Sequence, residues 1–191
     1  MQKDIRRGAT IFTVAGVILL GFIYLVVQYS RFNTPVGIGD TAPNIQERTV
    51  SGQSFSLEAL RGKPVLLNFF TTWCQPCIEE TPDLISFAKQ YGNDIHVVMI
   101  DRGDGPVMVQ QYVSKYHIPS NITVVLSPDD KWSSRYGVTG QPETFFITAD
   151  GAVMSHLIGP LAESQMLSYA KAAGCRCHPT QRQRGFVEEG G

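Results

Sequence analysis

The chain has 191 residues, a formal net charge of −1 and 43% hydrophobic residues. No excess of positive charge points to the neutralisation of phosphates, as in nucleic-acid-binding proteins. The length suits one globular domain with an additional segment attached. We therefore expect a single folded domain and no nucleic-acid partner.

The additional segment is an uncharged run from Ala9 to Val27. As a helix rising about 1.5 Å per residue it would be ~28 Å long, which is enough to span the hydrocarbon core of a bilayer. Three basic residues precede the run and one, Arg31, follows shortly after it. The positive-inside rule then predicts that residues 1–8 are cytoplasmic and that the chain after the run is extracytoplasmic.

Two other interpretations of this run are a cleavable signal peptide and a buried core helix. A signal peptide has a shorter apolar region and ends at a small-x-small site, which residues 26–30 (VVQYS) do not supply. The run is apolar on all sides and lies near the end of the sequence, and both properties argue against a buried core helix. We therefore predict a retained, single-pass signal-anchor helix over residues 9–27.

The rest of the chain predicts a tether over residues 28–38, a folded domain over 39–174 and a flexible, cysteine-containing tail over 175–191. Within the domain, a continuous apolar run (PVLLNFFT) is typical of a buried central strand. Apolar residues near the helical period then predict a long helix that ends at Gly92. In chain order we expect a hairpin over 49–56, a short helix over 56–60, a strand over 64–71, helix 77–91, strand 95–100, helix 107–116, strand 122–126, short helix 131–136, strands 143–148 and 152–158, and helix 163–173.

The motif WCQPC, Trp73 to Cys77, lies between that central strand and that helix. Residues i and i+3 of a helix have Cβ atoms roughly 5–6 Å apart, so a small adjustment brings two cysteines to the ~3.8 Å of a disulfide. The unpaired N–H groups of a helix start favour a thiolate, and Pro76 has no N–H to leave unpaired. The spacing therefore predicts a reversible dithiol.

Several motifs resemble those of the TlpA/ResA-like membrane-anchored thiol-disulfide oxidoreductases of the thioredoxin superfamily. They are the opening GDTAPN (39–44), the segment NFFTTWC (68–74), ETP (80–82) and GQPETFF (140–146). The resemblance implies an α/β thioredoxin-like fold, in which helices flank a central mixed sheet. It also implies an N-terminal hairpin extension and an inserted α-β element.

The resemblance also implies roles for individual residues. Cys74 would attack a substrate disulfide, and Cys77 would resolve the mixed disulfide. Pro142 matches the cis-proline beside the dithiol, so the backbone of Gln141 would be available to pair with a substrate strand. Trp73 would form part of the substrate platform, although packing against the core is an equal alternative from the residue alone.

Proton transfer and the direction of electron flow depend on the neighbouring residues. Gln75 and Pro76 provide no cation between the cysteines, which favours a reductant over a strong oxidant. Related proteins carry an acid at the position of Gln75 or of Asn68, so this chain departs from them twice. Glu80 remains as the acid that could relay a proton to or from Cys77, unless it is an exposed acid of the first helical turns.

The implied function is the extracytoplasmic reduction of disulfides in exported proteins, apocytochrome c among them. Because an oxidising exterior would re-oxidise the dithiol, we expect a membrane electron donor of the CcdA or DsbD type as a partner. The redox-active disulfide is the only redox group that this chemistry needs, and no separate cofactor is expected.

Cys175, Cys177 and His178 form a second cluster, on which the resemblance gives no guidance. They could hold a metal with a further ligand, as in a metal-binding or chaperone module, although three ligands are one short of a closed zinc site. They could also be a secondary dithiol that exchanges electrons with Cys74 and Cys77, or thiols of the tail without a redox role.

A peroxiredoxin-like peroxidase is the alternative enzyme. The signature of that family places proline seven residues, and threonine three residues, before the reactive cysteine. Thr71 fits this pattern, but Leu67 occupies the proline position.

Overall fold

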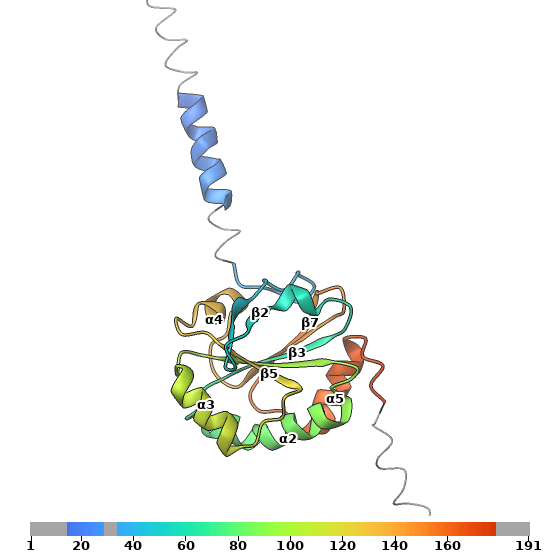
Figure 1. Ribbon diagram of the computed structural model, residues 1–191. Helices are drawn as coiled ribbons and strands as arrows, with labels where there is room; N and C mark the ends of the chain where they lie inside the picture. Colours follow the sequence, from blue (N-terminus) through green and yellow to red (C-terminus); the bar gives the residue numbers. More distant parts are fainter. Residues whose placement is uncertain (1–14, 29–33, 179–191) are drawn as a thin grey trace, which may run out of the picture. The chain divides into compact units, whose positions relative to one another are not determined.

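The structure is a computed structural model that describes residues 15–28 and 34–178 (Figure 1). The chain divides into two units, Met1–Pro35 and Val36–Gly191. In the first unit, residues 15–28 form a helix. Among the described residues, no helix combines the length and the apolar character needed to cross a membrane. Residues 1–14 lie outside the described part, so the signal anchor over 9–27 stays a prediction.

The second unit is built around one mixed sheet of seven strands in the order β2-β1-β5-β4-β3-β6-β7. Strands β3, β4 and β5 are parallel to one another, and the other neighbours in the sheet are antiparallel. The strands are β1 Gln46–Thr49, β2 Ser54–Ser56, β3 Val65–Phe70, β4 His96–Asp101, β5 Ile122–Leu126, β6 Glu143–Ile147 and β7 Val153–Ile158.

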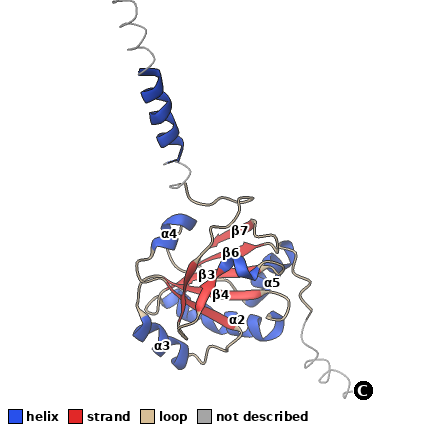
Figure 2. Ribbon diagram, turned by 45° about the horizontal axis from the view of Figure 1, so that its top comes forward, coloured by secondary structure: helices blue, strands red, loops and turns tan. Residues whose placement is uncertain are grey.

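Helices cover both faces of this sheet (Figure 2). Side chains of α2, α3 and α5 pack with one face of the strands, and residues of η1 and α4 pack with the other. The helices are η1 Leu57–Leu60, a 3-10 helix, α2 Gln75–Tyr91, α3 Pro106–Lys115, α4 Lys131–Tyr136 and α5 Glu163–Ala172. The predicted thioredoxin-like α/β architecture is confirmed.

Strand β3 is an inner strand of the sheet, between β4 and β6, and is buried along its whole length. Because successive side chains of a strand point to opposite faces, Leu66 and Phe70 contribute to the core beneath α2, whereas Leu67 and Phe69 contribute to the other core. Asn68 shares the face of Leu66 and Phe70. A polar side chain is thereby placed inside the core that α2 covers.

The functional motif lies where three strand ends meet. β3 runs parallel to β4, and β6 runs antiparallel to β3 with Glu143 opposite Phe69. The carboxyl ends of β3 and β4 and the start of β6 therefore share one edge of the sheet. Helix α2 begins there, with Cys74 as its N-cap and Pro76 in its first turn, and it ends at the predicted Gly92.

The inserted α-β element does more than extend a loop. Its strand β5 lies between β1 and β4 and pairs with both, so the N-terminal hairpin joins the sheet through β5. The tail predicted over residues 175–191 is not uniform. Cys175 and Cys177 are 6% and 7% exposed and belong to the core cluster of α2 and α5, while residues 179–191 lie outside the described residues.

Candidate active site

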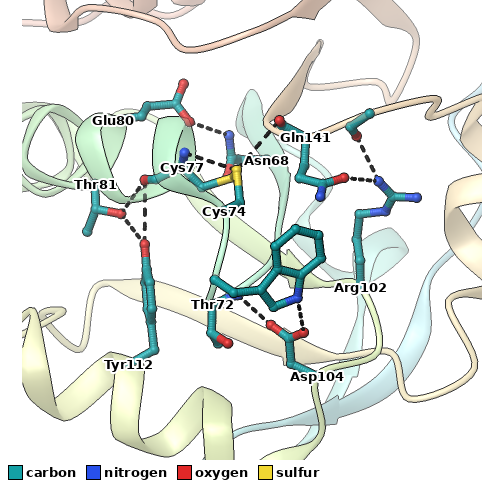
Figure 3. The surroundings of a disulfide bond; sticks show 12 residues. Asn68, Thr72, Cys74, Cys77, Glu80, Thr81, Arg102, Asp104, Tyr112 and Gln141 are labelled. Carbon is teal, nitrogen blue, oxygen red and sulfur yellow. Dashed lines mark hydrogen bonds between the residues drawn. A yellow bond between two sulfur atoms is a disulfide. The ribbon is translucent and has the colours of Figure 1, made fainter.

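Cys74 and Cys77 form a disulfide at the start of α2, with their Cα atoms 5.2 Å apart (Figure 3). The backbone N–H of Cys77 donates to Sγ of Cys74 at 3.2 Å, so the Cys74 sulfur is the acceptor that caps the helix. This N–H and the positive end of the helix dipole would also stabilise a Cys74 thiolate after reduction. In the disulfide form both sulfurs are largely covered, since Cys74 is 4% and Cys77 2% exposed.

The loop that precedes β6 lies beside Cys74. The Gln141–Pro142 peptide bond is cis, as the resemblance predicted. The carbonyl oxygen of Gln141 lies 3.6 Å from Sγ of Cys74. The structure therefore brings together Cys74, Gln141 and Pro142, which are distant in the sequence.

Glu80 lies one turn beyond Cys77 and is only 2% exposed, so its interpretation as an exposed acid is wrong. Its Oε1 accepts a hydrogen bond from the backbone N–H of Leu161 at 2.8 Å, and its Oε2 accepts one from Nδ2 of Asn68 at 2.9 Å. Burial raises the pKa of Glu80 to about 7 against the opposing effect of these two hydrogen bonds. A carboxyl with this pKa can gain or lose a proton near neutral pH.

Asn68 holds this carboxyl from the sheet side. Its Nδ2 also donates to Oγ1 of Thr144 at 2.9 Å, which fixes the amide between β3 and β6. The superfamily resemblance implied an acid at this strand position, and the chain has a neutral amide instead. The buried acid of this site therefore comes from the helix, through Glu80, and the strand supplies a donor to it.

Trp73 is 68% exposed, so its interpretation as a packing residue is wrong. Its indole Nε1 donates to Oδ1 of Asp104 at 3.0 Å, and the other carboxylate oxygen of Asp104 accepts the backbone N–H of Thr72. The indole of this residue, which directly precedes Cys74 in the chain, is thereby held at the surface, where a substrate can reach it.

Three charged residues around the site were missed by sequence reasoning: Arg102, Asp104 and Glu143. The first two follow β4, and Glu143 begins β6. The available signal was positional, because polar residues at strand ends along one edge of an α/β sheet are typical of a site. The segment DRGDG (101–105) directly after an apolar strand carries that signal.

Glu143 is fully buried and holds the loop before the cis-proline. Its Oε1 accepts the backbone N–H groups of Thr139 at 2.8 Å and Gly140 at 2.7 Å, and its Oε2 lies 2.6 Å from Nε2 of His156. Burial favours the neutral acid, but the hydrogen bonds from His156, Thr139 and Gly140 outweigh it and lower the pKa of Glu143.

The second cysteine pair is also a disulfide, between Cys175 and Cys177. The backbone N–H of His178 donates to Asp94 at 3.2 Å, which places this pair near the far end of α2. Helix α2 has seventeen residues, so its two ends are about 25 Å apart at 1.5 Å per residue. That separation does not fit direct exchange with Cys74 in one molecule.

Metal binding by this pair also finds no support in the geometry. Within residues 15–28 and 34–178, no group of three or more histidine, cysteine, aspartate or glutamate side chains is placed to hold a metal. In the disulfide form Cys175 and Cys177 offer no thiolate to a metal, because each sulfur is bonded to the other.

A disulfide of two cysteines three residues apart, at the start of a helix and beside a cis-proline on a thioredoxin-like sheet, defines a thiol-disulfide oxidoreductase.

Comparisons with known proteins agree. The AhpC/TSA family matches residues 38–156. Thiol-disulfide oxidoreductase ResA of Bacillus thuringiensis (strain Al Hakam) is 31% identical over 170 residues, 87% of this chain and 97% of that protein. ResA of Bacillus subtilis (strain 168) is 28% identical over 86% of this chain and 93% of its own length. The chain therefore belongs to the AhpC/TSA family and, within it, to the ResA-like thiol-disulfide oxidoreductases.

A solved structure is similar as well. A thiol:disulfide interchange protein of the thioredoxin family from Chlorobium tepidum TLS has a TM-score of 0.63 and 29% identity. The match covers 73% of this chain and 97% of that one.

Proposed function

We propose that this oxidoreductase is a membrane-anchored, extracytoplasmic reductase of disulfides in exported proteins, with apocytochrome c as a substrate. The observation that carries the proposal is the position of Cys74, which caps α2 and faces the carbonyl of Gln141 across 3.6 Å. A thiolate at this position is stabilised by the helix and has a polypeptide backbone beside it.

The reaction starts from the reduced dithiol. The Cys74 thiolate attacks one sulfur of the substrate disulfide, and the other substrate sulfur leaves as a thiolate and takes up a proton. The Cys77 thiolate then attacks Sγ of Cys74, which releases the second substrate sulfur and forms the Cys74–Cys77 disulfide. Two electrons pass from the dithiol to the substrate; one of the two protons comes from the Cys77 thiol and the other from water, because Cys74 reacts as a thiolate that has already lost its proton.

Glu80 supports the second step. Cys77 must lose its proton before it can attack, and the Cys77 thiol shares a helix face with Glu80 at i+3. A carboxyl whose pKa is about 7 can accept this proton at neutral pH, and the leaving substrate thiolate then takes it up. The backbone N–H of Leu161 and the amide of Asn68 each donate a hydrogen bond to one of the two carboxylate oxygens.

The segment between the cysteines supports the proposed direction of electron flow, from the dithiol to the substrate. Gln75 is exposed and donates to Glu79 at 3.0 Å, and Pro76 is apolar, so neither adds a positive charge that would stabilise the reduced form. This environment supports a donor of electrons. In an oxidising compartment such a donor needs recharging, and a membrane protein of the CcdA or DsbD type is the proposed source.

The proposed location rests on the uncharged run of residues 9–27 and on the basic residues before it. The part of this run that the structure describes, residues 15–27, is helical, and large apolar side chains such as Leu20 and Ile23 are exposed on it. A lipid environment would remove that apolar surface from water.

Trapping tests the proposal directly. Cys77→Ser in the full-length chain prevents resolution, so substrates should stay disulfide-linked to Cys74 and be identifiable by mass spectrometry after non-reducing purification. Recovery of exported proteins with disulfides, apocytochromes c among them, is the expected result. The matched control is Cys74→Ser, which should capture none of them. An absence of mixed disulfides with Cys77→Ser would overturn the proposal, and peroxide consumption by the wild type would favour the peroxidase alternative.

A further inference from the structure

The side chain of Arg102 makes contacts on three sides at the end of β4. Its Nη1 donates to the carbonyl oxygen of Gly140 at 2.8 Å and to Oε1 of Gln141 at 2.6 Å. Its Nε donates to Oγ of Ser133 at 2.8 Å, and its Nη2 forms an ion pair with Asp130 at 3.1 Å. The side chain is only 15% exposed, so these contacts are largely shielded from water.

These contacts join three parts of the chain that are distant in sequence. Arg102 follows β4, Ser133 and Asp130 belong to the start of α4, and Gly140 and Gln141 form the loop before cis-Pro142. Figure 3 shows the guanidinium group reaching the Gln141 side chain from the side opposite the disulfide. The residue that faces Cys74 with its backbone is thus held by Arg102 through its side chain.

The loop before Pro142 is consequently held by two charged groups of opposite sign. Glu143 accepts the N–H groups of Thr139 and Gly140, and Arg102 donates to the acceptors of Gly140 and Gln141. Hydrogen bonds to charged groups are stronger than neutral ones, and the planar guanidinium fixes several directions at once. The conformation of residues 139–141 is therefore fixed both through backbone N–H groups, which donate to Glu143, and through oxygen acceptors, to which Arg102 donates.

We propose that Arg102 is a positioning residue for polypeptide substrates. By fixing Gly140 and Gln141 it keeps the Gln141 backbone in register with Cys74, so that an extended segment flanking the substrate disulfide can pair with it. A small disulfide makes no such backbone pairing and gains nothing from Arg102. This inference rests on the proposed reduction of protein disulfides and adds a residue that distinguishes polypeptide from small-molecule substrates.

The test compares two substrates with full-length protein in detergent. Arg102→Met should raise the KM for insulin roughly tenfold, since it removes several hydrogen bonds to a charged group, and should leave kcat nearly unchanged. The rate with 5,5′-dithiobis(2-nitrobenzoate), a small disulfide, should stay within about twofold of the wild type. Arg102→Lys keeps the positive charge but loses the planar guanidinium with its several N–H donors, and it should give an intermediate KM for insulin.

Arg48→Met is the matched control. Arg48 donates to the carbonyl of Gly52 at 3.0 Å in the hairpin of β1 and β2, away from the cysteines, and this variant should behave as the wild type with both substrates.

Two results would overturn the inference while leaving the proposed function intact. One is an unchanged KM for insulin in Arg102→Met. The other is an equal loss with insulin and with the small disulfide in both Arg102 variants, which would mean that Arg102 only supports folding. A wild-type protein that fails to reduce insulin would instead overturn the proposed function.

Discussion

Nδ2 of Asn68 donates to Oε2 of Glu80 at 2.9 Å inside the core that α2 covers. The buried acid thus belongs to the helix, and the strand contributes a neutral hydrogen-bond donor to it. The amide cannot ionise, so the titration of Glu80 is not coupled to a second carboxyl at this strand position. The opposing effects of burial and of two donors leave the pKa of Glu80 at about 7.

Glu80→Gln should lower the rate of insulin reduction at pH 7 by roughly 10²-fold, the usual contribution of a positioned acid or base. It should also remove the ionisation near pH 7 from the pH–rate profile. Steady-state rates between pH 5 and 9 measure both effects. Glu79→Gln, the exposed neighbour, is the control and should keep the wild-type profile. A profile that survives in Glu80→Gln would exclude Glu80 as the titrating group.

The same carboxyl predicts how stability depends on pH. The pKa of Glu80 rises from 4.5 in the unfolded chain to about 7 in the fold, so the native state binds more protons between these values. Stability should therefore be fully present below about pH 4.5 and fall as the pH rises to 7, by at most about 3 kcal/mol.

Denaturant unfolding of the oxidised protein at several pH values measures this slope. Burial also raises the pKa of Asp101, to about 6, and adds a slope of the same sign. The difference between the wild type and Glu80→Gln isolates the contribution of Glu80. A difference that does not change between pH 4.5 and 8 would contradict the assignment.

Asn68→Asp restores the acid that the family resemblance implies for this strand. Two carboxyls would then lie at hydrogen-bonding distance in a buried site, and like charges there cannot both form without a large cost. We expect one of them to stay protonated well above pH 7 and the rate optimum to move to higher pH. Asn68→Ser removes the amide without adding charge and should leave the optimum nearer to its wild-type position.

Asp104→Asn should loosen the surface around Cys74. Asp104 accepts hydrogen bonds from the indole of Trp73 and from the backbone N–H of Thr72, and an amide has one acceptor oxygen for the two donors. We expect a several-fold higher KM for insulin and a change in Trp73 fluorescence, measured in a Trp132→Phe background. Asp150→Asn, in the turn between β6 and β7, is the control. Unchanged fluorescence would show that Asp104 does not hold the indole.

Local signals in the sequence were sufficient for the elements of the fold. The apolar run of β3, the helical period of α2 and Gly92 at its end depend on neighbours in the chain, and so does the spacing of Cys74 and Cys77. The structure therefore agrees with these predictions to within a residue or two at most ends.

The environment of each site residue could not be obtained in this way. An acid in the first turns of a helix is usually exposed, and Glu80 is buried only because Leu161 and Asn68 arrive from other segments. Arg102 belongs to none of the motifs recognised in the sequence, and its contacts come from α4 and from the loop before β6. Such contacts between distant segments are set by the tertiary structure and leave no periodicity.

The disulfide between Cys175 and Cys177 has a consequence for any redox titration of this protein. All four cysteines are paired in the described structure, so complete reduction would take up four electrons and expose four thiols, although only one pair lies beside the cis-proline. A midpoint potential fitted to total thiols would therefore average two couples. Replacing Cys175 and Cys177 together by serine leaves a two-electron protein, whose titration reports the Cys74–Cys77 couple alone.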